Sequence, residues 1–400
     1  MPPMGDLLTI DEALALVLER VRPLSSERLA LAAAAGRVLA EDVLAEVDLP
    51  PCRSSAMDGF AVRAEDTPGT LPLALRIAAG RPAGRPLAPG ETMGISTGGV
   101  VPDDADAVVP IEVVVDRANS VEFPDAVESG ANVRPVGGDV RAGHPVLAAG
   151  TTLAAAHLGA AAAAGAAELV CFRRPRVAIL STGTELRRPG EELEPGQIYE
   201  ANSVLLAAAA GGAGAEVERL EPVADDEGAL RAALERGLRA DVLISSGGVS
   251  VGPHDLVRSV GGELGVEEVF WRVAVKPGKP VSFGVRGRSL VFGLPGNPVS
   301  ALVGFELFVR AALRALQGDP EPGPRFLPGS LASPLRRLGS RDQLVRARSG
   351  VEDGATVLRP LSGQDSHMIV RAAEADALVH VARGDGELAA GEAVRYLPLS

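Results

Sequence analysis

The chain has 400 residues, 46% hydrophobic and only 3% aromatic, which predicts several domains whose cores consist mainly of Ala, Val and Leu. Its net charge of −13 comes from well-mixed acidic and basic residues, which excludes the clustered basic surface of a nucleic-acid-binding protein. The two cysteines, Cys52 and Cys171, have no CxxC spacing, which excludes a disulfide framework and is typical of a cytoplasmic protein.

The N-terminal part of the chain predicts two helices. Thr9 and Glu12 form a capping-box pattern, and apolar residues then recur at helical spacing as far as Val21. A second short helix is expected around 29–40. The first residues lack the basic and apolar regions of a secretory signal. The alanine-rich run 151–172 is interrupted by polar residues, so we expect a packed helix and a strand rather than a membrane span.

Residues 60–135 read as short strands separated by Gly and Pro turns, which predicts a small β-rich module. The segment SSAMDGF before it contains an Asp-Gly turn, and ordinary hairpin chemistry is enough to explain that signal. The loop at 96–99, STGG, offers hydroxyls and backbone amides, so it is either an anion-binding loop or a simple turn. Asp139 is expected to be exposed where the module ends.

From residue 176 onward, strands alternate with helices, which predicts a parallel sheet with helices on both faces. The loops at 181–185, 246–255 and 293–298 would then lie at the carboxyl edge of the sheet, where such folds bind ligands. Asn297 and Pro298 are suited to the N-cap and first position of a helix. Beyond 325, short strands predict a small separate β domain.

Lysine occurs only twice, at Lys276 and Lys279, and both lie in the motif KPGKP. The remaining 37 of the 39 basic residues are arginine. A chain that otherwise uses arginine for positive charge keeps two lysines in one tight loop, which suggests that a compact ammonium group holds an oxyanion or phosphate. Chance retention in a solvated turn is the alternative.

Common catalytic motifs are mostly absent. Neither lysine lies in a Walker A loop, and the histidines show no zinc-binding spacing. The sequence GVSVG around Ser250 matches a nucleophile elbow, but Pro253 fits the expected helix poorly. Carboxylates follow strands of the α/β unit at Glu185, at Asp225 or Asp226, and at Asp255. Together with the lysines, they favour a Mg²⁺-assisted phosphoryl site over a set of unrelated caps.

Seven motifs carry a resemblance to a known family. They are GRVLAEDV (36–43), LPPCRSSAMDGFAV (49–62), STGGVVPDDADAVVP (96–110), VAILSTGTEL (177–186), DVLISSGGVSVGPHD (241–255), KPGKP (276–280) and GLPGNPVSA (293–301). In this order the chain resembles, over nearly its whole length, the MoeA family of molybdopterin molybdenumtransferases and the matching domain of gephyrin. The resemblance implies an enzyme that inserts molybdate into adenylated molybdopterin and releases AMP with Mg²⁺.

The resemblance also implies site residues. The catalytic candidates are Asp58, Glu185, Asp225, Asp255, Lys276 and Lys279, with Glu185 and Asp255 as the ligands of Mg²⁺. The candidates for substrate binding are Thr97, Asp139, Ser246, Gly247, Gly248, Ser250, Pro295, Gly296, Asn297, Pro298, Arg346 and Ser366. The glycine loops would hold nucleotide and phosphates with backbone amides. The chain departs from the family pattern at Phe60, at 200–202 and at Arg272, which stands where a lysine is common.

The implied architecture has a central molybdopterin-binding α/β domain at 173–322 and a small barrel-like β domain at 323–400. An N-terminal α+β region of residues 1–50 and 140–172 would carry the inserted β-rich module 51–139. The resemblance further implies a cytoplasmic homodimer whose active site is shared between subunits, with other proteins of molybdenum cofactor synthesis as partners. No membrane or nucleic-acid partner is expected.

Two other functions fit part of the sequence. A molybdopterin adenylyltransferase uses the same type of α/β domain, and the additional N- and C-terminal domains argue against it. A non-catalytic scaffold that carries the cofactor is the second alternative, and the intact set of acids and lysines argues against that. The sequence does not separate molybdate from tungstate, because the two oxyanions share charge and nearly share size.

Overall fold

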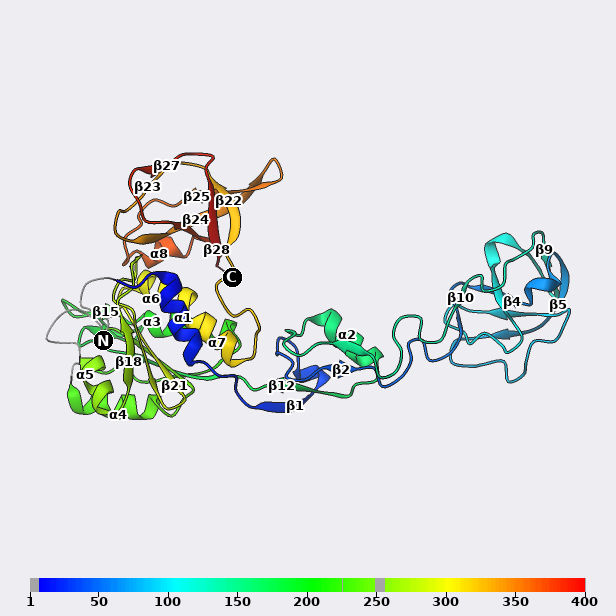
Figure 1. Cartoon of the computed structure of the whole chain (residues 1–400), viewed down its shortest axis with the longest axis horizontal. Coiled ribbons are helices and arrows are strands. Elements are labelled where there is room, and N and C mark those ends of the chain that lie inside the picture. The colour runs from blue at the N-terminus through cyan, green and yellow to red at the C-terminus, as the bar shows by residue number, and fades with distance from the viewer. Residues whose placement is uncertain (1–6, 225, 249–255, 400) are drawn as a thin grey trace. The chain divides into compact units, whose positions relative to one another are not determined.

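The computed structural model describes residues 7–224, 226–248 and 256–399. The chain divides into two compact units, and each is described by itself (Figure 1). The first comprises Met1–Glu27, Gly36–Val38 and Phe172–Ser400, and the second comprises Arg28–Ala35 and Leu39–Cys171. The chain passes between the units within strands β1 (Ser26–Ala30) and β12 (Glu168–Phe172), and also on either side of Gly36–Val38. The finer division into four domains stays a prediction.

The first unit begins with helix α1 (Ile10–Arg20), and its predicted capping box is confirmed. The Glu12 amide donates to Thr9 Oγ1 (3.1 Å), and the Thr9 amide donates to Glu12 Oε2 (2.8 Å). These bonds satisfy two amides that a helix N-terminus otherwise leaves without acceptors. Hydrogen bonding to Thr9 also lowers the pKa of Glu12.

The helix expected around 29–40 is wrong. That segment holds the end of β1 and a single 3-10 turn, η1 (Leu31–Ala33). Gly36 then adopts a φ of +73°, which ends any helix there. Leu39 and Ala40 donate their amides to Thr151 O and Val170 O, so long-range pairing replaces local helical bonds.

A six-stranded sheet forms the centre of the first unit. Its strands, in order, are β16 (Glu216–Arg219), β13 (Arg176–Ser181), β17 (Val242–Ser246), β21 (Ser289–Leu294), β20 (Ser282–Arg286) and β18 (Glu267–Trp271). The first four are parallel, as predicted, while β20 is antiparallel to both of its neighbours. The short loop that joins β20 to β21 imposes this reversal, because parallel neighbours need a long crossover.

Helices cover both faces of this sheet, as the alternating sequence predicted. Residues at alternate positions of β13 face opposite cores, so Val177 and Ile179 pack on one side and Ala178 and Leu180 on the other. One face carries α1, α3 (Asn202–Gly212), α6 (Pro298–Gly304), the π-helical turn η4 (Phe305–Val309) and α7 (Arg310–Leu316). The other carries α4 (Glu227–Gly237) and α5 (Leu256–Glu263).

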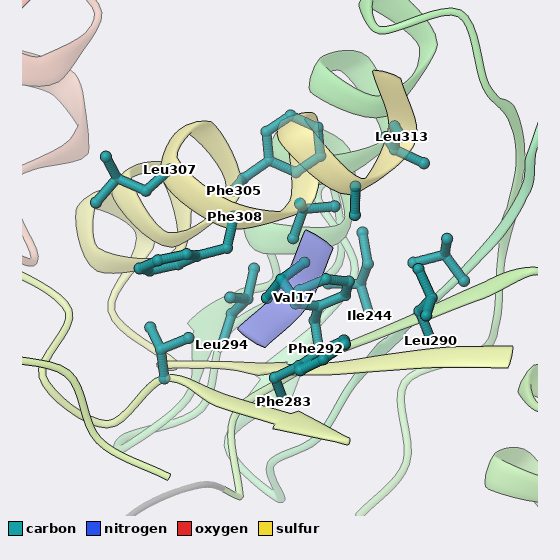
Figure 2. Close-up of a cluster of buried hydrophobic side chains, with 14 of the residues drawn as sticks. Val17, Ile244, Phe283, Leu290, Phe292, Leu294, Phe305, Leu307, Phe308 and Leu313 are labelled. Carbon is teal, nitrogen blue, oxygen red and sulfur yellow. The ribbon is translucent and has the colours of Figure 1, made fainter. Parts of the chain in front are cut away.

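The larger of these two cores consists mainly of Ala, Val and Leu, as predicted, but it also gathers five phenylalanines among the described residues. Figure 2 shows Phe283 and Phe292 from the sheet beneath Phe305 and Phe308 from the helices. The rings of Phe283 and Phe292 lie 4.9 Å apart, and both side chains are almost fully buried. Composition averaged over the chain concealed this local concentration.

The C-terminal part of the first unit is a small barrel. Strands β24 (Asp342–Glu352), β25 (Ala355–Pro360), β22 (Leu327–Leu331), β28 (Ala393–Pro398) and β26 (Ala377–Val381) pair in this order, and β26 pairs back to β24. The short strand β19 (Val275–Lys276) adds to β24 from outside the ring. Smaller elements are α8 (Ile369–Ala372) and the pairs β14 (Leu186–Arg187) with β15 (Ile198–Tyr199) and β23 (Leu335–Arg336) with β27 (Glu387–Leu388).

The second unit contains the predicted β-rich module. Its six-stranded sheet has the order β7 (Ala107–Pro110), β4 (Gly59–Val62), β6 (Thr92–Ile95), β5 (Gly69–Ile77), β9 (Ser120–Phe123) and β8 (Val115–Arg117). Two further pairs join β3 (Ser54–Ser55) to β10 (Val133–Arg134) and β2 (Val43–Leu44) to β11 (Pro145–Leu147). The run 151–172 forms helix α2 (Ala155–Ala163) and strand β12, as expected. Across the described residues, no helix combines the length and apolar character needed to cross a membrane.

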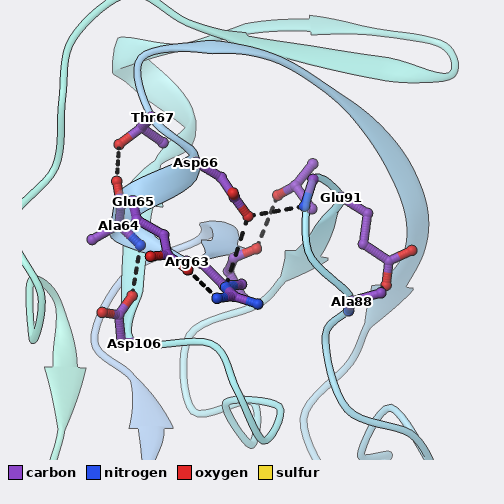
Figure 3. Close-up of polar contacts among 11 residues, drawn as sticks. Arg63, Ala64, Glu65, Asp66, Thr67, Ala88, Glu91 and Asp106 are labelled. Atoms are coloured by element: carbon purple, nitrogen blue, oxygen red, sulfur yellow. Dashed lines mark hydrogen bonds and ion pairs between the residues drawn. The ribbon is translucent and has the colours of Figure 1, made fainter.

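Polar contacts fix the turn that follows β4 (Figure 3). Arg63 forms ion pairs with Glu65 and Asp66, and the Ala64 amide donates to Asp106 Oδ1 over 2.7 Å. Thr67 Oγ1 closes the turn by donating to Ala64 O over 2.8 Å. These bonds hold the short helix η2 (Ala64–Asp66) against the strand that begins at residue 107.

Candidate functional site

Three loops meet at the carboxyl edge of the central sheet and line a cleft of about 850 Å³. They follow β13, β17 and β21, which are adjacent parallel strands. The structure therefore brings together many of the residues that the sequence singled out. Those that line the cleft are Glu185, Ser246, Gly247, Gly248, Pro295, Gly296, Asn297 and Pro298.

Gly247 and Gly248 allow the loop after β17 to approach the loop after β13. Gly247 has a φ of +94°, and a Cβ there would lie 2.5 Å from Thr182 O. Gly248 has a φ of +64°, and a Cβ there would lie 2.7 Å from a methyl group of Val257. Any other residue would be strained at both positions and would push the loops apart.

The backbone amides of these loops differ in availability. The Gly247 amide donates to Leu294 O over 3.1 Å and continues the ladder between β17 and β21. It therefore cannot hold a phosphate as the sequence predicted for this residue. The Gly248 and Gly296 amides donate to no acceptor within the described part of the chain, so they remain available to an anion.

Asn202 connects the end of β17 to the loop after β21 and was not among the predicted site residues. Its Nδ2 donates to Ser246 Oγ (2.8 Å) and to Gly296 O (2.7 Å). Ser246 Oγ in turn donates to Pro295 O over 3.3 Å. The partners of Asn202 lie far away in the sequence, so no local pattern could have revealed this connection.

Glu200, which also lines the cleft, is 4% exposed and has a structural role. Its carboxylate accepts from Ser181 Oγ (2.8 Å) and from the Ser203 amide (2.7 Å) and hydroxyl. A carboxylate at the start of a helix is also stabilised by the helix dipole. Glu200 thus fixes the first turn of α3 against β13 with its oxygens already in use.

Glu185 is the carboxylate in the cleft that is free to bind a ligand. Its side chain is exposed and has no hydrogen bond or ion pair with the described residues. The described residues form no cluster of three or more potential metal ligands. Mg²⁺ commonly binds through one or two carboxylates plus substrate phosphates, so Glu185 fits as a ligand of that kind.

The two lysines are exposed, and the motif that carries them reaches the wall of the cleft at Pro280. Lys276 lies on β19, and Lys279 is followed by Pro280, which lines the cleft. Within the described ranges, neither ammonium group has a hydrogen bond or ion pair. Arg272, one of the positions at which the chain departs from the expected pattern, places its guanidinium 3.7 Å from the centre of the Trp271 ring. That stacking explains how an arginine is accommodated there.

Asn297 occupies the predicted N-cap position of α6, with Pro298 at the start of the helix, but its side chain does not cap the helix. Instead, Asn297 Nδ2 donates to Ser366 Oγ over 2.9 Å, and the Val299 amide donates to Ser366 O over 3.1 Å. The predicted site residues Asn297 and Ser366 therefore meet, and the loop that carries Ser366 also places His367 on the cleft wall.

Arg346, predicted to bind substrate directly, is only 1% exposed. Its guanidinium donates to Gly363 O (2.8 Å), Met368 O (2.9 Å) and Asp365 O (3.1 Å). Burial lowers the pKa of the Arg346 guanidinium, and the charge of Asp365 raises that pKa by a smaller amount. Direct contact with a ligand is not supported by this geometry, because the guanidinium is enclosed by the loop that carries Ser366.

The second unit holds three other candidates. Thr97 donates to Asp58 Oδ1 from its amide (2.6 Å) and from its hydroxyl (3.0 Å), and these bonds lower the pKa of Asp58. The SAMDG and STGG motifs therefore form one polar cluster around the Asp58 carboxylate. Asp139 is exposed, and its amide donates to Leu49 O over 2.9 Å.

Three predicted site residues, Asp225, Ser250 and Asp255, lie outside the described residues. Asp226, the alternative to Asp225, is the N-cap of α4, and its side chain accepts from the Ala229 amide over 2.7 Å.

The fold and the cleft are those of a molybdopterin-binding α/β domain joined to further N- and C-terminal regions. Family models match residues 8–165 as the MoeA N-terminal region (domains I and II), 178–315 as a probable molybdopterin binding domain, and 328–399 as the MoeA C-terminal region (domain IV). The chain belongs to the MoeA family, which acts in molybdenum cofactor biosynthesis and whose named members are transferases.

Relatives and solved structures cover almost the whole chain. Molybdopterin molybdenumtransferase 2 of Mycobacterium tuberculosis H37Rv is 39% identical over 411 residues, covering 98% of this chain and 100% of that protein. Molybdopterin molybdenumtransferase of Haemophilus influenzae is 33% identical, with coverage of 98% and 99%. The MoeA crystal structure from Pyrococcus horikoshii OT3 has a TM-score of 0.86 at 28% identity, covering 98% of this chain and 100% of that one.

Proposed function

We propose that the protein inserts molybdate into adenylated molybdopterin and releases AMP in a Mg²⁺-dependent reaction. The observation that carries this proposal is the cleft at one sheet edge, which contains unbonded amides and a free carboxylate and has Pro280 of the KPGKP motif in its wall. Such a site suits a ligand that contains phosphates and a second oxyanion. Relatives at 33–39% identity bear the name of this activity.

Amides and lysines of the chain would bind the anionic groups of the substrates, and carboxylates would bind the metal ion. The Gly248 and Gly296 amides would hold phosphate oxygens without any change in the backbone. Lys276 and Lys279 would attract molybdate and the phosphates to the same edge of the sheet. Glu185, with Asp255, would hold Mg²⁺, which when bound would withdraw negative charge from the phosphoanhydride. Fixed donors of this kind need little reorganisation during reaction, which lowers the barrier.

The second unit would supply the remaining groups. We propose that the protein is a homodimer and that the Asp58–Thr97 cluster and Asp139 of one subunit complete the cleft of the other. The two hydrogen bonds from Thr97, which lower the pKa of Asp58, support a polar or charge-pairing role. Location in the cytoplasm, and partners among other proteins of molybdenum cofactor synthesis, belong to the same proposal.

The test is AMP release from adenylated molybdopterin by the purified protein, with molybdate and Mg²⁺ each added or omitted. We expect release only when both are present. Consumption of ATP to form the adenylated pterin would support the adenylyltransferase instead, and tight binding without release would support a scaffold. Glu185→Gln should lose release, while Glu192→Gln, an exposed carboxylate outside the cleft lining, should retain it.

A further inference from the structure

The amide of Asn202 is held in one orientation. It is the first residue of α3, and its Nδ2 donates to both Gly296 O (2.7 Å) and Ser246 Oγ (2.8 Å). A carbonyl oxygen only accepts, so the amide nitrogen, and not the amide oxygen, must face Gly296. Ser246 Oγ donates its own hydrogen to Pro295 O, so it accepts from Asn202. Both amide hydrogens are therefore in use.

The remaining polar atom of Asn202, Oδ1, is an acceptor without a protein donor in the part of the chain that the structure describes. Asn202 lines the cleft together with its partners Ser246 and Gly296. Rotating the amide to present a donor would break two hydrogen bonds and set Oδ1 against the Gly296 carbonyl. The Oδ1 of Asn202 is therefore a hydrogen-bond acceptor of fixed orientation in a cleft whose other groups mostly favour anions.

An acceptor of this kind selects the chemistry of what binds beside it. Oδ1 repels phosphate and molybdate oxygens and requires an N–H or O–H donor. In adenylated molybdopterin, whose binding is the function proposed above, the rigid donors are the amino and ring N–H groups of the heterocycles. We propose that Asn202 is a specificity-determining residue whose Oδ1 accepts a hydrogen bond from a heterocyclic amino group of the substrate.

Glu200 supports this arrangement as a positioning residue. By accepting from the Ser203 amide and from Ser181 Oγ, it fixes the first turn of α3 to the end of β13. Asn202 lies between these contacts and the loop after β21, so its Cα has little freedom. A preorganised acceptor discriminates more sharply than a mobile one, because it cannot relax to suit a ligand that lacks the donor.

The experiment measures dissociation constants by calorimetry for two pairs of probes that differ only in the amino group. One pair is AMP and purine riboside 5′-monophosphate, and the other is 6-hydroxymethylpterin phosphate and its 2-desamino counterpart. We expect the wild-type protein to prefer the amino-bearing member of one pair by about tenfold, the equivalent of one good hydrogen bond. The pair that shows the preference identifies whether adenine or pterin lies at Asn202.

Asn202→Ala should abolish this preference, so that the ratio of the two constants approaches unity. Asn202→Asp keeps an acceptor but loses both N–H donors. The dissociation constants of both members of the pair should therefore rise, while the preference for the amino-bearing member persists. If Asn202→Ala fails to fold, Asn202→Asp and wild type still carry the test. Equal binding of both members of each pair by wild type would overturn the inference, as would a wild-type preference that Asn202→Ala retains. Failure of wild type to bind any probe would instead contradict the proposed function.

Discussion

Asn297 donates from Nδ2 to Ser366 Oγ over 2.9 Å, which joins the loop after β21 to the loop that precedes α8 of the barrel. Asn297 lines the cleft, and Ser366 supports it through this hydrogen bond. The C-terminal barrel therefore contributes directly to the site that the α/β domain forms, and this dependence can be measured.

Ser366→Ala should weaken ligand binding with little effect on folding. The substitution removes the Oγ contact but leaves the Val299 amide bonded to the backbone oxygen of residue 366, so the loop keeps one anchor. Loss of one neutral hydrogen bond of about 1 kcal/mol predicts an approximately fivefold higher dissociation constant for AMP. Ser362→Ala is the matched control, because Ser362 Oγ accepts from Arg371 in the same loop away from the cleft lining. Equal losses in both variants would count against the role of Ser366.

Lys279→Ala should reduce AMP release on the order of a hundredfold, the usual effect of removing one group that stabilises charge at a reaction centre. Lys279→Arg should recover only part of the rate, because guanidinium is planar and less compact. Arg288→Ala removes an exposed cation from the β20–β21 turn, at the opposite end of the same sheet, and should leave the rate unchanged. Steady-state rates at saturating molybdate decide between these outcomes, and full activity of Lys279→Arg would contradict a need for ammonium.

Phe292→Ala should destabilise the first unit by about 3–5 kcal/mol, because its buried ring packs on Phe283 in the largest core. Val351→Ala, at a position 76% exposed, should change stability by less than about 0.5 kcal/mol. Urea unfolding followed by circular dichroism measures both. A small effect of Phe292→Ala would mean that the core collapses around the missing ring.

Asp241→Asn should lose stability in a pH-dependent manner. Burial alone would raise the pKa of Asp241, but the two bonds from Arg173 (2.7 Å each) and one from the Arg176 amide (2.8 Å) outweigh burial and hold the pKa below its ordinary value. A depressed folded-state pKa adds stability that is present above the unfolded-state pKa of about 4 and disappears as pH falls through the folded-state pKa.

We therefore expect Asp241→Asn to cost about 1.5–3 kcal/mol at neutral pH, where the carboxylate is charged. The difference from wild type should shrink below about pH 4, as the wild-type carboxylate is protonated. Urea unfolding at neutral and acidic pH measures this difference. A cost that stays constant across the range would show that the charge on Asp241 does not matter.

Thr182→Val should leave the free protein as stable or make it more stable. Thr182 is 8% exposed, and its buried Oγ1 has no hydrogen-bond partner among the described residues. Burying an unpaired hydroxyl is unfavourable, and valine keeps the shape without it. The adjacent Ser181→Ala removes a hydroxyl that donates to Glu200, so it should cost about 1 kcal/mol. The melting temperature should stay the same or rise for Thr182→Val and should fall for Ser181→Ala. Shifts in the same direction would contradict the assignment of an unpaired hydroxyl to Thr182.

Local patterns predicted the elements that depend on nearby residues. The Thr9–Glu12 capping box joins residues three positions apart, and the α/β alternation and the strand that follows α2 are visible in the local spacing of apolar residues, although their strands pair with distant ones. The same approach failed at 29–40, where distant segments take up the backbone amides of Leu39 and Ala40. It also did not locate the phenylalanines within the largest core, because average composition does not show where the rings gather.

The residues of the candidate site likewise divide into those that a local sequence pattern predicts and those whose role depends on distant parts of the chain. Motif residues such as Gly248 and Asn297 lie in the cleft because they follow neighbouring parallel strands, which the sequence pattern predicts. Asn202 was missed because its partners are 44 and 94 positions away. Arg346 carries the charge expected of a ligand contact, and only its three-dimensional surroundings reveal that the guanidinium is enclosed.

The most direct test of the account is a single-turnover experiment that follows molybdenum and AMP together. The protein is mixed with adenylated molybdopterin, Mg²⁺ and molybdate, and the pterin product is then separated and its molybdenum content measured. The account predicts that molybdenum appears on the pterin at the same rate and in the same amount as AMP appears in solution. AMP release without transfer of molybdenum to the pterin would contradict it.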